Sequence, residues 1–397
     1  MIYSLSIHAD YRCRHSGVCC TSDWDVPVEL PLYRSLAAAL SGGGITAAGT
    51  PADDDSVLIV EPDLPDDAGA MVARTATGDC VFYHRTSGLC VVHRDLGEPM
   101  LPATCRYFPR IAVRDWRGTF ISLTHYCPTA ADMLFRDDVP LEIVESPSAF
   151  PPRDYEGLRV DKEAWPPMLH PAMLMDLAAY SAWERHMVMR CADTRLSPEA
   201  VIATLWCDAR VLRAWEPTDG PLAGVVASLV DRGARPSGSP GEPERFAPQT
   251  LDHGLMLHAE VMCAVPQDLR PDPDDEGLRE TFTGVVAPHW SAFAAPLRRY
   301  LAAKAFANWT AYQGRGVLAI VRGLEAALAV VRVEATRECR NAGRALDAEL
   351  LKQAFRGTDF LLNHLAVGED LAERWSRVED GPPEGGPHVR GGRLEPA

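Results

Sequence analysis

Residues 104–110, Thr-Cys-Arg-Tyr-Phe-Pro-Arg, lie at the centre of a region rich in cysteine. Seven cysteines fall within the first 127 residues: Cys13, Cys19, Cys20, Cys80, Cys90, Cys105 and Cys127. The whole chain has 11 cysteines, and the remaining two thirds contain only Cys191, Cys207, Cys263 and Cys339. This clustering predicts that the cysteine side chains in the first third of the chain share one function.

A hydrophobic content of 47% indicates a globular protein with buried cores. The length of 397 residues exceeds the usual size of one compact domain, so we expect two domains. The net charge of -16 argues against broad binding to nucleic acid or to anionic membranes. The longest apolar run, residues 317–333, contains three charged residues, so we expect no membrane segment.

The first ten residues have neither a basic segment nor an apolar run of signal-peptide length, and we therefore expect a cytoplasmic protein. In a reducing compartment, clustered cysteines favour metal binding or redox chemistry over structural disulfides.

The first 150 residues have the pattern of short strands, turns and loops. Residues 80–84 and 89–93 are predicted to form a hairpin, which would bring Cys80 close to Cys90. Other expected elements are an extended lead-in over residues 1–12, strands at 26–30 and 57–60, a helix at 32–40, a hairpin of residues 111–113 with 119–123, and a helix from about Thr129.

From about residue 165 the pattern becomes helical. The predicted helices are 171–191, 200–215 with a cap at Ser197, 251–264, 290–312, 317–345 and 348–365. Residues 232–249 are predicted to form a linker, and residues 373–397 a disordered tail. The expected fold is α+β, with a loop-rich cysteine-cluster domain over residues 1–150 and a mainly α-helical domain over residues 165–372.

The cysteine pattern resembles the YkgJ-type cysteine-cluster family, and within it the flagellin lysine N-methylase group. The residues that carry this likeness are Cys13, Cys19 and Cys20, then Cys80, the segment CVVHRDLGEPMLPATCRYFPR at 90–110, and Cys127 with Pro128. The likeness covers about residues 10–135, and Ser16 stands where the family has a further cysteine. It implies a zinc or iron centre, above all an iron–sulfur cluster, and for this branch a methyl transfer from S-adenosylmethionine to a protein lysine.

The residues themselves leave the ligand set open, because seven thiols exceed the four that a [4Fe–4S] cluster or a structural zinc requires. One centre with three spare thiols is possible, and so are two centres that also use His15, His84, His93 or His125. Arg106 and Arg110 flank Cys105 and either place positive charge near the centre or form ion pairs. The four later cysteines are interpreted as buried apolar residues.

The leading hypothesis is therefore an iron–sulfur protein that methylates lysine in a protein substrate. The alternatives are a non-catalytic zinc-stabilised interaction module and a thiol redox or metal-delivery protein. No Rossmann-type glycine loop and no Cys-x3-Cys-x2-Cys motif occurs, so no residue is assigned to S-adenosylmethionine or to catalysis. A cofactor site between the two domains would involve the region of Arg299, Lys304, Trp309 and Tyr312, although such residues serve packing more often. Oligomeric state does not follow from the sequence.

Overall fold

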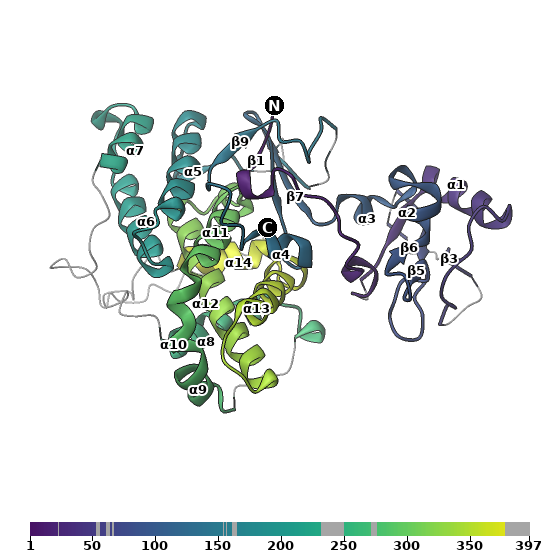
Figure 1. Cartoon of the computed structure of the whole chain (residues 1–397). Helices are drawn as coiled ribbons and strands as arrows, with labels where there is room; N and C mark the ends of the chain where they lie inside the picture. The colour runs from purple at the N-terminus through teal and green to yellow at the C-terminus, as the bar shows by residue number, and fades with distance from the viewer. Residues whose placement is uncertain are drawn as a thin grey trace, which may run out of the picture.

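The computed structural model describes residues 1–22, 24–52, 56–60, 64–65, 67–153, 155, 157–160, 165–231, 250–270 and 276–377. The expected linker at 232–249 lies outside these residues, as does the expected tail from residue 378 onward. The structure combines sheets and helices, in agreement with the α+β class. Figure 1 shows a larger body, which contains most of the helices, and a smaller lobe that carries α1, α2, β3, β5 and β6.

The main sheet has the strand order β10-β7-β8-β1-β9. Its strands are β1 Ile2–Leu5, β7 Arg110–Asp115, β8 Gly118–Leu123, β9 Ile143–Glu145 and β10 Gly157–Arg159. The predicted second hairpin is confirmed as the antiparallel pair β7 and β8. The expected lead-in is instead an interior strand, because β1 pairs in parallel with β8 and in antiparallel with β9. The 3₁₀ turn η1, Ser6–His8, follows it.

The smaller lobe is built from short elements. They are η2 Val18–Cys20, β2 Pro27–Glu29, α1 Leu30–Ser41, β3 Leu58–Ile59, β4 Ala68–Val72, β5 Tyr83–His84, β6 Leu89–Cys90, α2 Val91–Leu96, η3 Glu98–Met100 and α3 Ala103–Tyr107. The predicted hairpin of residues 80–84 and 89–93 forms as β5 and β6. Its second strand is shorter than predicted, because Val91 and Val92 are both buried. Neighbouring residues of a strand face opposite sides, and a helical turn buries this pair instead.

The body contains eleven helices within the described residues. They are α4 Pro128–Met133, α5 Leu177–Ala192, α6 Pro198–Arg213, α7 Leu222–Asp231, α8 Leu251–Met262, α9 Leu278–Thr281, α10 Ala287–Trp290, α11 Ala294–Ala305, α12 Val317–Ala342, α13 Ala348–Phe360 and α14 Gly368–Ser376. The remaining turns and strands are η4 Pro217–Asp219, η6 Gln267–Leu269, η7 Phe282–Val286, η8 Ser291–Phe293, η9 Trp309–Tyr312, η10 Leu361–Leu365, β11 Met168–His170 and β12 Met173–Leu174.

Several predicted helix bounds change. The Ser197 cap is confirmed, since its Oγ accepts a hydrogen bond from the Ala200 amide at 3.1 Å. The helix predicted from residue 171 begins at Leu177, after the hairpin of β11 and β12. The helix predicted at 290–312 breaks into shorter pieces, and α11 ends before Ala307, whose φ is 52°. Helix α14 continues to Ser376, inside the range expected for the tail, because Trp375 packs in the core.

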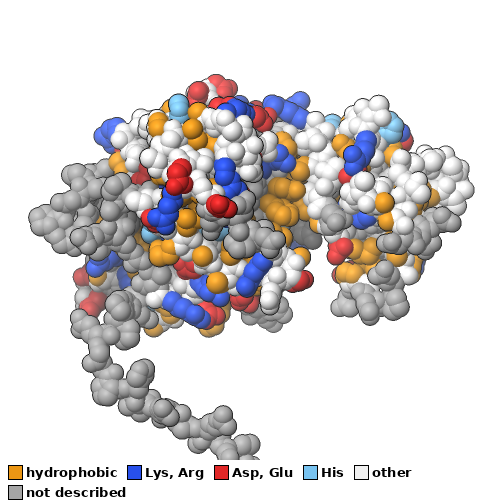
Figure 2. All heavy atoms as spheres, turned by 90° about the horizontal axis from the view of Figure 1, so that it is seen from below, with side chains coloured by type: hydrophobic (Ala, Val, Ile, Leu, Met, Phe, Trp, Pro, Cys, Tyr) orange, Lys and Arg blue, Asp and Glu red, His pale blue; other side chains and the backbone are white. Residues whose placement is uncertain are grey.

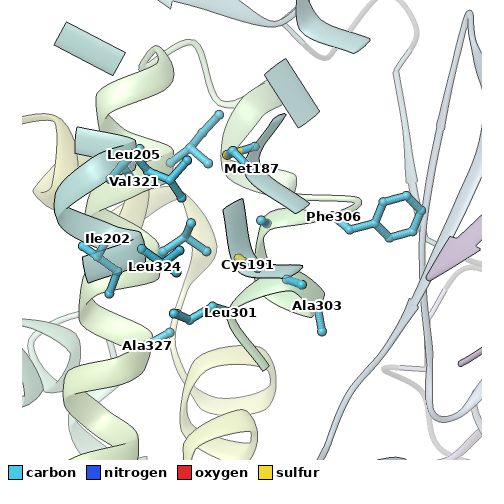
Figure 3. Close-up of a cluster of buried hydrophobic side chains, with 14 of the residues drawn as sticks. Met187, Cys191, Ile202, Leu205, Leu301, Ala303, Phe306, Val321, Leu324 and Ala327 are labelled. Atoms are coloured by element: carbon cyan, nitrogen blue, oxygen red, sulfur yellow. The ribbon is translucent and has the colours of Figure 1, made fainter. Parts of the chain in front are cut away.

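One hydrophobic core joins the main sheet to the helices. It includes Leu5 and Val113 from the sheet together with Tyr180 and Tyr300 from the helices. Figure 3 shows part of it, where side chains of α5, α6, α11 and α12 point toward one another and Phe306 points toward the sheet. The smaller lobe has a separate core. Among the described residues, no helix is both long enough and apolar enough to cross a membrane.

Candidate metal centre

Five of the seven N-terminal cysteines converge in the core of the smaller lobe. They are Cys19 and Cys20 from η2, Cys80 from the loop before β5, Cys90 from β6 and Cys105 from α3. Two contacts connect these segments: the Cys80 amide donates to the Cys20 carbonyl at 2.7 Å, and Tyr83 pairs with Cys90 across the hairpin. The predicted approach of Cys80 and Cys90 is therefore confirmed, and three distant segments supply thiols to one place.

Gly17 allows the turn that places the first two of these cysteines. Its φ of 78° lies in the left-handed region, and its carbonyl accepts a hydrogen bond from the Cys20 amide at 2.8 Å. A Cβ atom at this position would collide with the ring of Tyr83. Glycine is thus required both for the backbone conformation and for the close approach of η2 to β5.

The thiols of this cluster perturb one another. The Sγ atoms of Cys19 and Cys20 lie 3.9 Å apart. A hydrogen bond from Cys20 lowers the pKa of Cys19, and a second one lowers the pKa of Cys90 to about 7. Backbone amides at the start of α2 also donate to Cys90 and favour its thiolate. Burial acts in the opposite direction and raises the pKa of Cys80 to about 11 and that of Cys105 well above its usual range.

Arg74 is a cation that acts on several of these thiols, and no local sequence pattern indicates it. Its positive charge opposes the effect of burial and lowers the pKa of Cys19, Cys80 and Cys105. A backbone bridge pairs Arg74 with Cys80, and its guanidinium donates to the Trp24 carbonyl. Its buried Nη1 has no hydrogen-bond partner in the described part of the chain. This donor is therefore available to a thiolate.

Cys13 and Cys127 lie outside the five-thiol cluster. Cys127 belongs to the core beside the main sheet, where its sulfur is 3.8 Å from the Tyr11 hydroxyl. Cys13 is exposed and accepts a hydrogen bond from the His15 amide at 3.4 Å. Desolvation raises the pKa of both thiols, since the sulfur of Cys13 is partly shielded although the residue is exposed, and the charge of Cys19 adds to that effect. The two thus lie within electrostatic reach of the cluster, at its edge.

The four histidines considered as ligands have other partners. His125 is fully buried in the body, and its Nδ1 lies 3.1 Å from a carboxylate oxygen of Asp359. The Nδ1 of His84 is 2.8 Å from the Ser87 hydroxyl. The rings of His15 and His93 pack together, with their centroids 5.2 Å apart.

The two arginines that flank Cys105 differ in their surroundings. The guanidinium of Arg106 is 3.9 Å from Glu29, in the geometry of an ion pair. Arg110 packs against the rings of Tyr11 and Phe150, and its charge lowers the pKa of Cys13. Arg106 therefore belongs to the lobe's ion pairs, whereas Arg110 acts on the outer thiol of Cys13.

The donor set of the cluster fits a thiolate-bound metal. Five soft sulfur donors exceed the four that a tetrahedral zinc or a [4Fe–4S] cluster takes. Zn–S bonds of about 2.3 Å place sulfurs at tetrahedral corners about 3.8 Å apart, close to the 3.9 Å between Cys19 and Cys20. Among the described residues, no three His, Cys, Asp or Glu side chains are already arranged around a metal position.

A cavity of 560 Å³ lies beside α3, between the smaller lobe and the body. Its wall includes Thr104, Tyr107 and Phe108 from the segment around Cys105, and Lys304 from α11. Figure 2 shows hydrophobic surface in the hollow between the two parts of the molecule. Comparisons of the chain with protein-family models, with curated proteins and with solved structures found no significant match.

Proposed function

We propose that the smaller lobe binds an iron–sulfur cluster through four of the thiols of Cys19, Cys20, Cys80, Cys90 and Cys105. The observation that carries this proposal is the convergence of five thiols from three distant segments in one small core. A single buried cysteine needs no more explanation than any small apolar residue. Five together in a chain expected to be cytoplasmic are explained by a shared ligand.

The surroundings of the cluster support the same proposal. Arg74 provides positive charge next to three of the thiols, which favours their ligating thiolate form. Amides at the start of α2 donate to the sulfur of Cys90. A bound cluster would supply one-electron transfer, with a potential set by such charges and hydrogen bonds.

A zinc-stabilised, non-catalytic interaction module is the second candidate, and the distance of 3.9 Å between Cys19 and Cys20 favours it. This distance fits two ligands of the same tetrahedral ion. The lobe also has few large buried side chains, and a structural metal stabilises such small cores. Thiol redox chemistry or metal delivery is supported by one residue, Cys13, which is exposed next to the cluster.

Methyl transfer from S-adenosylmethionine to a protein lysine is the activity that we propose for the cluster-bearing protein. It rests on the resemblance of the cysteine region to the flagellin lysine N-methylase group. The cavity beside α3 supports it, because a methyl donor needs an open space and Thr104, the neighbour of Cys105, lies on the cavity wall. A protein substrate is part of this proposal, and no described residue is assigned a catalytic role.

The test is anaerobic purification, followed by absorption spectroscopy and by iron, sulfide and zinc analysis of the same sample. Absorption at about 400 nm, with about four iron and four sulfide per chain, is the expected result. A colourless protein with one zinc per chain would establish the second candidate instead. A fully folded protein that retains no metal would contradict both.

Methyl transfer is tested separately by incubating the metal-loaded protein with labelled S-adenosylmethionine and protein extract. Label on lysine is the expected result. Its absence would remove the methyl-transfer proposal and leave the metal centre in place.

A further inference from the structure

The cavity beside α3 has the size and the walls of a small-molecule site. Its 560 Å³ lies within the range of about 300–1,000 Å³ typical of ligand pockets. Apolar walls come from several parts of the chain: Phe108, Leu123, Phe306, Leu324 and Trp375. Such walls accommodate the apolar part of an organic ligand.

The charge of the wall is positive, although the chain as a whole is strongly acidic. Lys304 and Arg110 line the cavity, and no aspartate or glutamate is among its described lining residues. The whole chain has 55 acidic and 39 basic residues, whereas the described cavity wall has two basic residues and no acidic one. A cavity wall that carries charge of one sign concentrates ligands of the opposite sign.

Lys304 is held in place at the cavity and retains a free donor. Its Nζ is 2.5 Å from a carboxylate oxygen of Asp359 and 3.5 Å from Oδ1 of Asn363. An ammonium group has three N–H donors, so one has no nitrogen or oxygen acceptor among the described residues, although Nζ also lies 5.3 Å from the centre of the Tyr300 ring. The side chain is 15% exposed and lies on the cavity wall, so the remaining donor can meet a ligand there.

Asp359 holds the ammonium group of Lys304 in position through their ion pair. It is fully buried and also accepts hydrogen bonds from the Tyr300 hydroxyl at 2.7 Å and from the His125 amide at 2.5 Å. Burial alone would raise the pKa of Asp359, but the charge of Lys304 and the hydrogen bond from His125 outweigh it and lower that pKa. The anchor is thus an ordered ammonium group rather than a mobile surface lysine.

Arg110 is the second cation among the lining residues, and its guanidinium packs over the rings of Tyr11 and Phe150, which do not themselves line the cavity. Its Nη1 donates to the Arg106 carbonyl at 3.2 Å, whereas its buried Nε has no partner in the described part of the chain. No carboxylate of the described residues lies within ion-pair distance of its guanidinium. The indole Nε1 of Trp24, at the same cavity, is also buried without a partner among these residues.

Two irregular backbone features also lie at this cavity. The π-helical turn η10 places Asn363 and His364 on the wall, and turns of this kind are frequent at functional sites. Ala307, also on the wall, has a φ of 52° in the left-handed region, which is costly for alanine. Strain of this kind concentrates at ligand-binding positions.

We propose that this cavity binds an amphipathic organic anion, whose carboxylate or similar group lies against Lys304 and whose apolar or aromatic part lies against Phe108 and Trp24. The free N–H of Lys304 donates to an oxygen of the anion, and Arg110 adds to the positive potential. This ligand site does not depend on the identity of the metal or on methyl transfer.

The test is calorimetric titration of the full-length, metal-loaded protein with two probes of the same shape, 2-naphthoate and 2-naphthamide. The anion should bind at least about tenfold more tightly than the neutral amide, since charge-assisted hydrogen bonds are the stronger kind. Lys304→Met should reduce this preference to about threefold or less and leave the affinity for 2-naphthamide unchanged. Lys352→Met, which removes a charge outside the cavity wall, should keep the full preference.

A second variant tests the location without removing the buried ion pair. Thr310 lies on the cavity wall and is partly exposed, so Thr310→Trp should fill the space and weaken both probes at least about tenfold. The proposal is overturned if the wild type binds neither probe, or both equally. It is also overturned if the preference survives in a folded Lys304→Met protein or if Thr310→Trp has no effect.

Discussion

The Sγ atoms of Cys19 and Cys20 lie 3.9 Å apart, although the two residues are adjacent in sequence. Neighbouring side chains of a strand or a helix point in different directions, and the tight turn after Gly17 brings these two together. We therefore expect Gly17→Ala to lower the metal content of the purified protein and to destabilise the smaller lobe. The left-handed φ alone costs about 1 kcal/mol, and the collision with Tyr83 adds to it.

Gly43→Ala is the matched control for this change. Gly43 has a similar φ of 71°, but a Cβ atom there meets nothing within 4 Å. It should show the backbone cost alone, with normal metal content. Equal metal content in the two variants would mean that the approach of η2 to Tyr83 does not determine the position of the thiols.

The division of the seven thiols into five and two leads to a prediction about ligation. Cys105→Ser and Cys20→Ser should each reduce bound metal substantially, because both residues lie in the cluster. Cys13→Ser should retain it, because Cys13 is exposed at the edge. Metal analysis of each variant is the measurement, and Cys339→Ser on α12 serves as a control for a buried cysteine far from the lobe. Loss of metal in Cys13→Ser would extend the ligand set to the outer thiols.

The arrangement of the thiols could be predicted in part, because some of its determinants are local. The turn between β5 and β6 is encoded in four residues, and it alone brings Cys80 near Cys90. The number of thiols in the first third of the chain indicated a shared role before any contact was known. The separation of Cys127 from the five clustered thiols depends on which core its segment joins, and Cys13 belongs to neither of these cores. That choice is made by long-range packing and leaves no local pattern.

Of the polar groups at the cavity and beside the thiols, the sequence indicated Lys304 as part of a site between the domains but neither Asp359 nor Arg74. Arg74 has no sequence motif, and its role arises from a backbone bridge to Cys80. Lys304 and Asp359 are 55 residues apart and meet only when α11 and α13 pack. A weak signal did exist for Asp359, which follows Leu351 and Phe355 at helical spacing on a buried face. A carboxylate in such a row indicates a buried partner but does not identify it.

Arg117 connects the main sheet to the helices, and its removal should strongly destabilise the body. Its guanidinium is 2.8 Å from Asp115 and 2.9 Å from Glu184, both of them almost fully buried. Arg117→Met leaves these carboxylates without their cation, which costs about 3–5 kcal/mol for a buried pair. Urea unfolding followed by circular dichroism measures the loss. Arg195→Met, which removes an exposed guanidinium beside Asp193, is the control and should reduce stability far less.

His8 should make the stability of the body depend on pH. It is completely buried, and its Nε2 lies 3.4 Å from Nε2 of His125. Burial is the main cause that lowers its pKa well below 6.5, and the neighbouring His125 adds to the effect. Below about pH 6.5 the unfolded chain binds a proton at this residue and the folded chain does not. The unfolded state is then favoured, so stability falls as the pH is lowered through this window.

The expected contribution is about 1.4 kcal/mol per pH unit from His8, until the pH reaches its folded pKa. Urea unfolding of the wild type and of His8→Gln at several pH values between 7.5 and 5 measures it, and the variant should show the shallower slope. His289→Gln, which alters an exposed histidine, should retain the slope of the wild type. Equal slopes for the wild type and His8→Gln would show that His8 takes up a proton in the folded protein, which would require Asp359 to stabilise the charged pair of histidines.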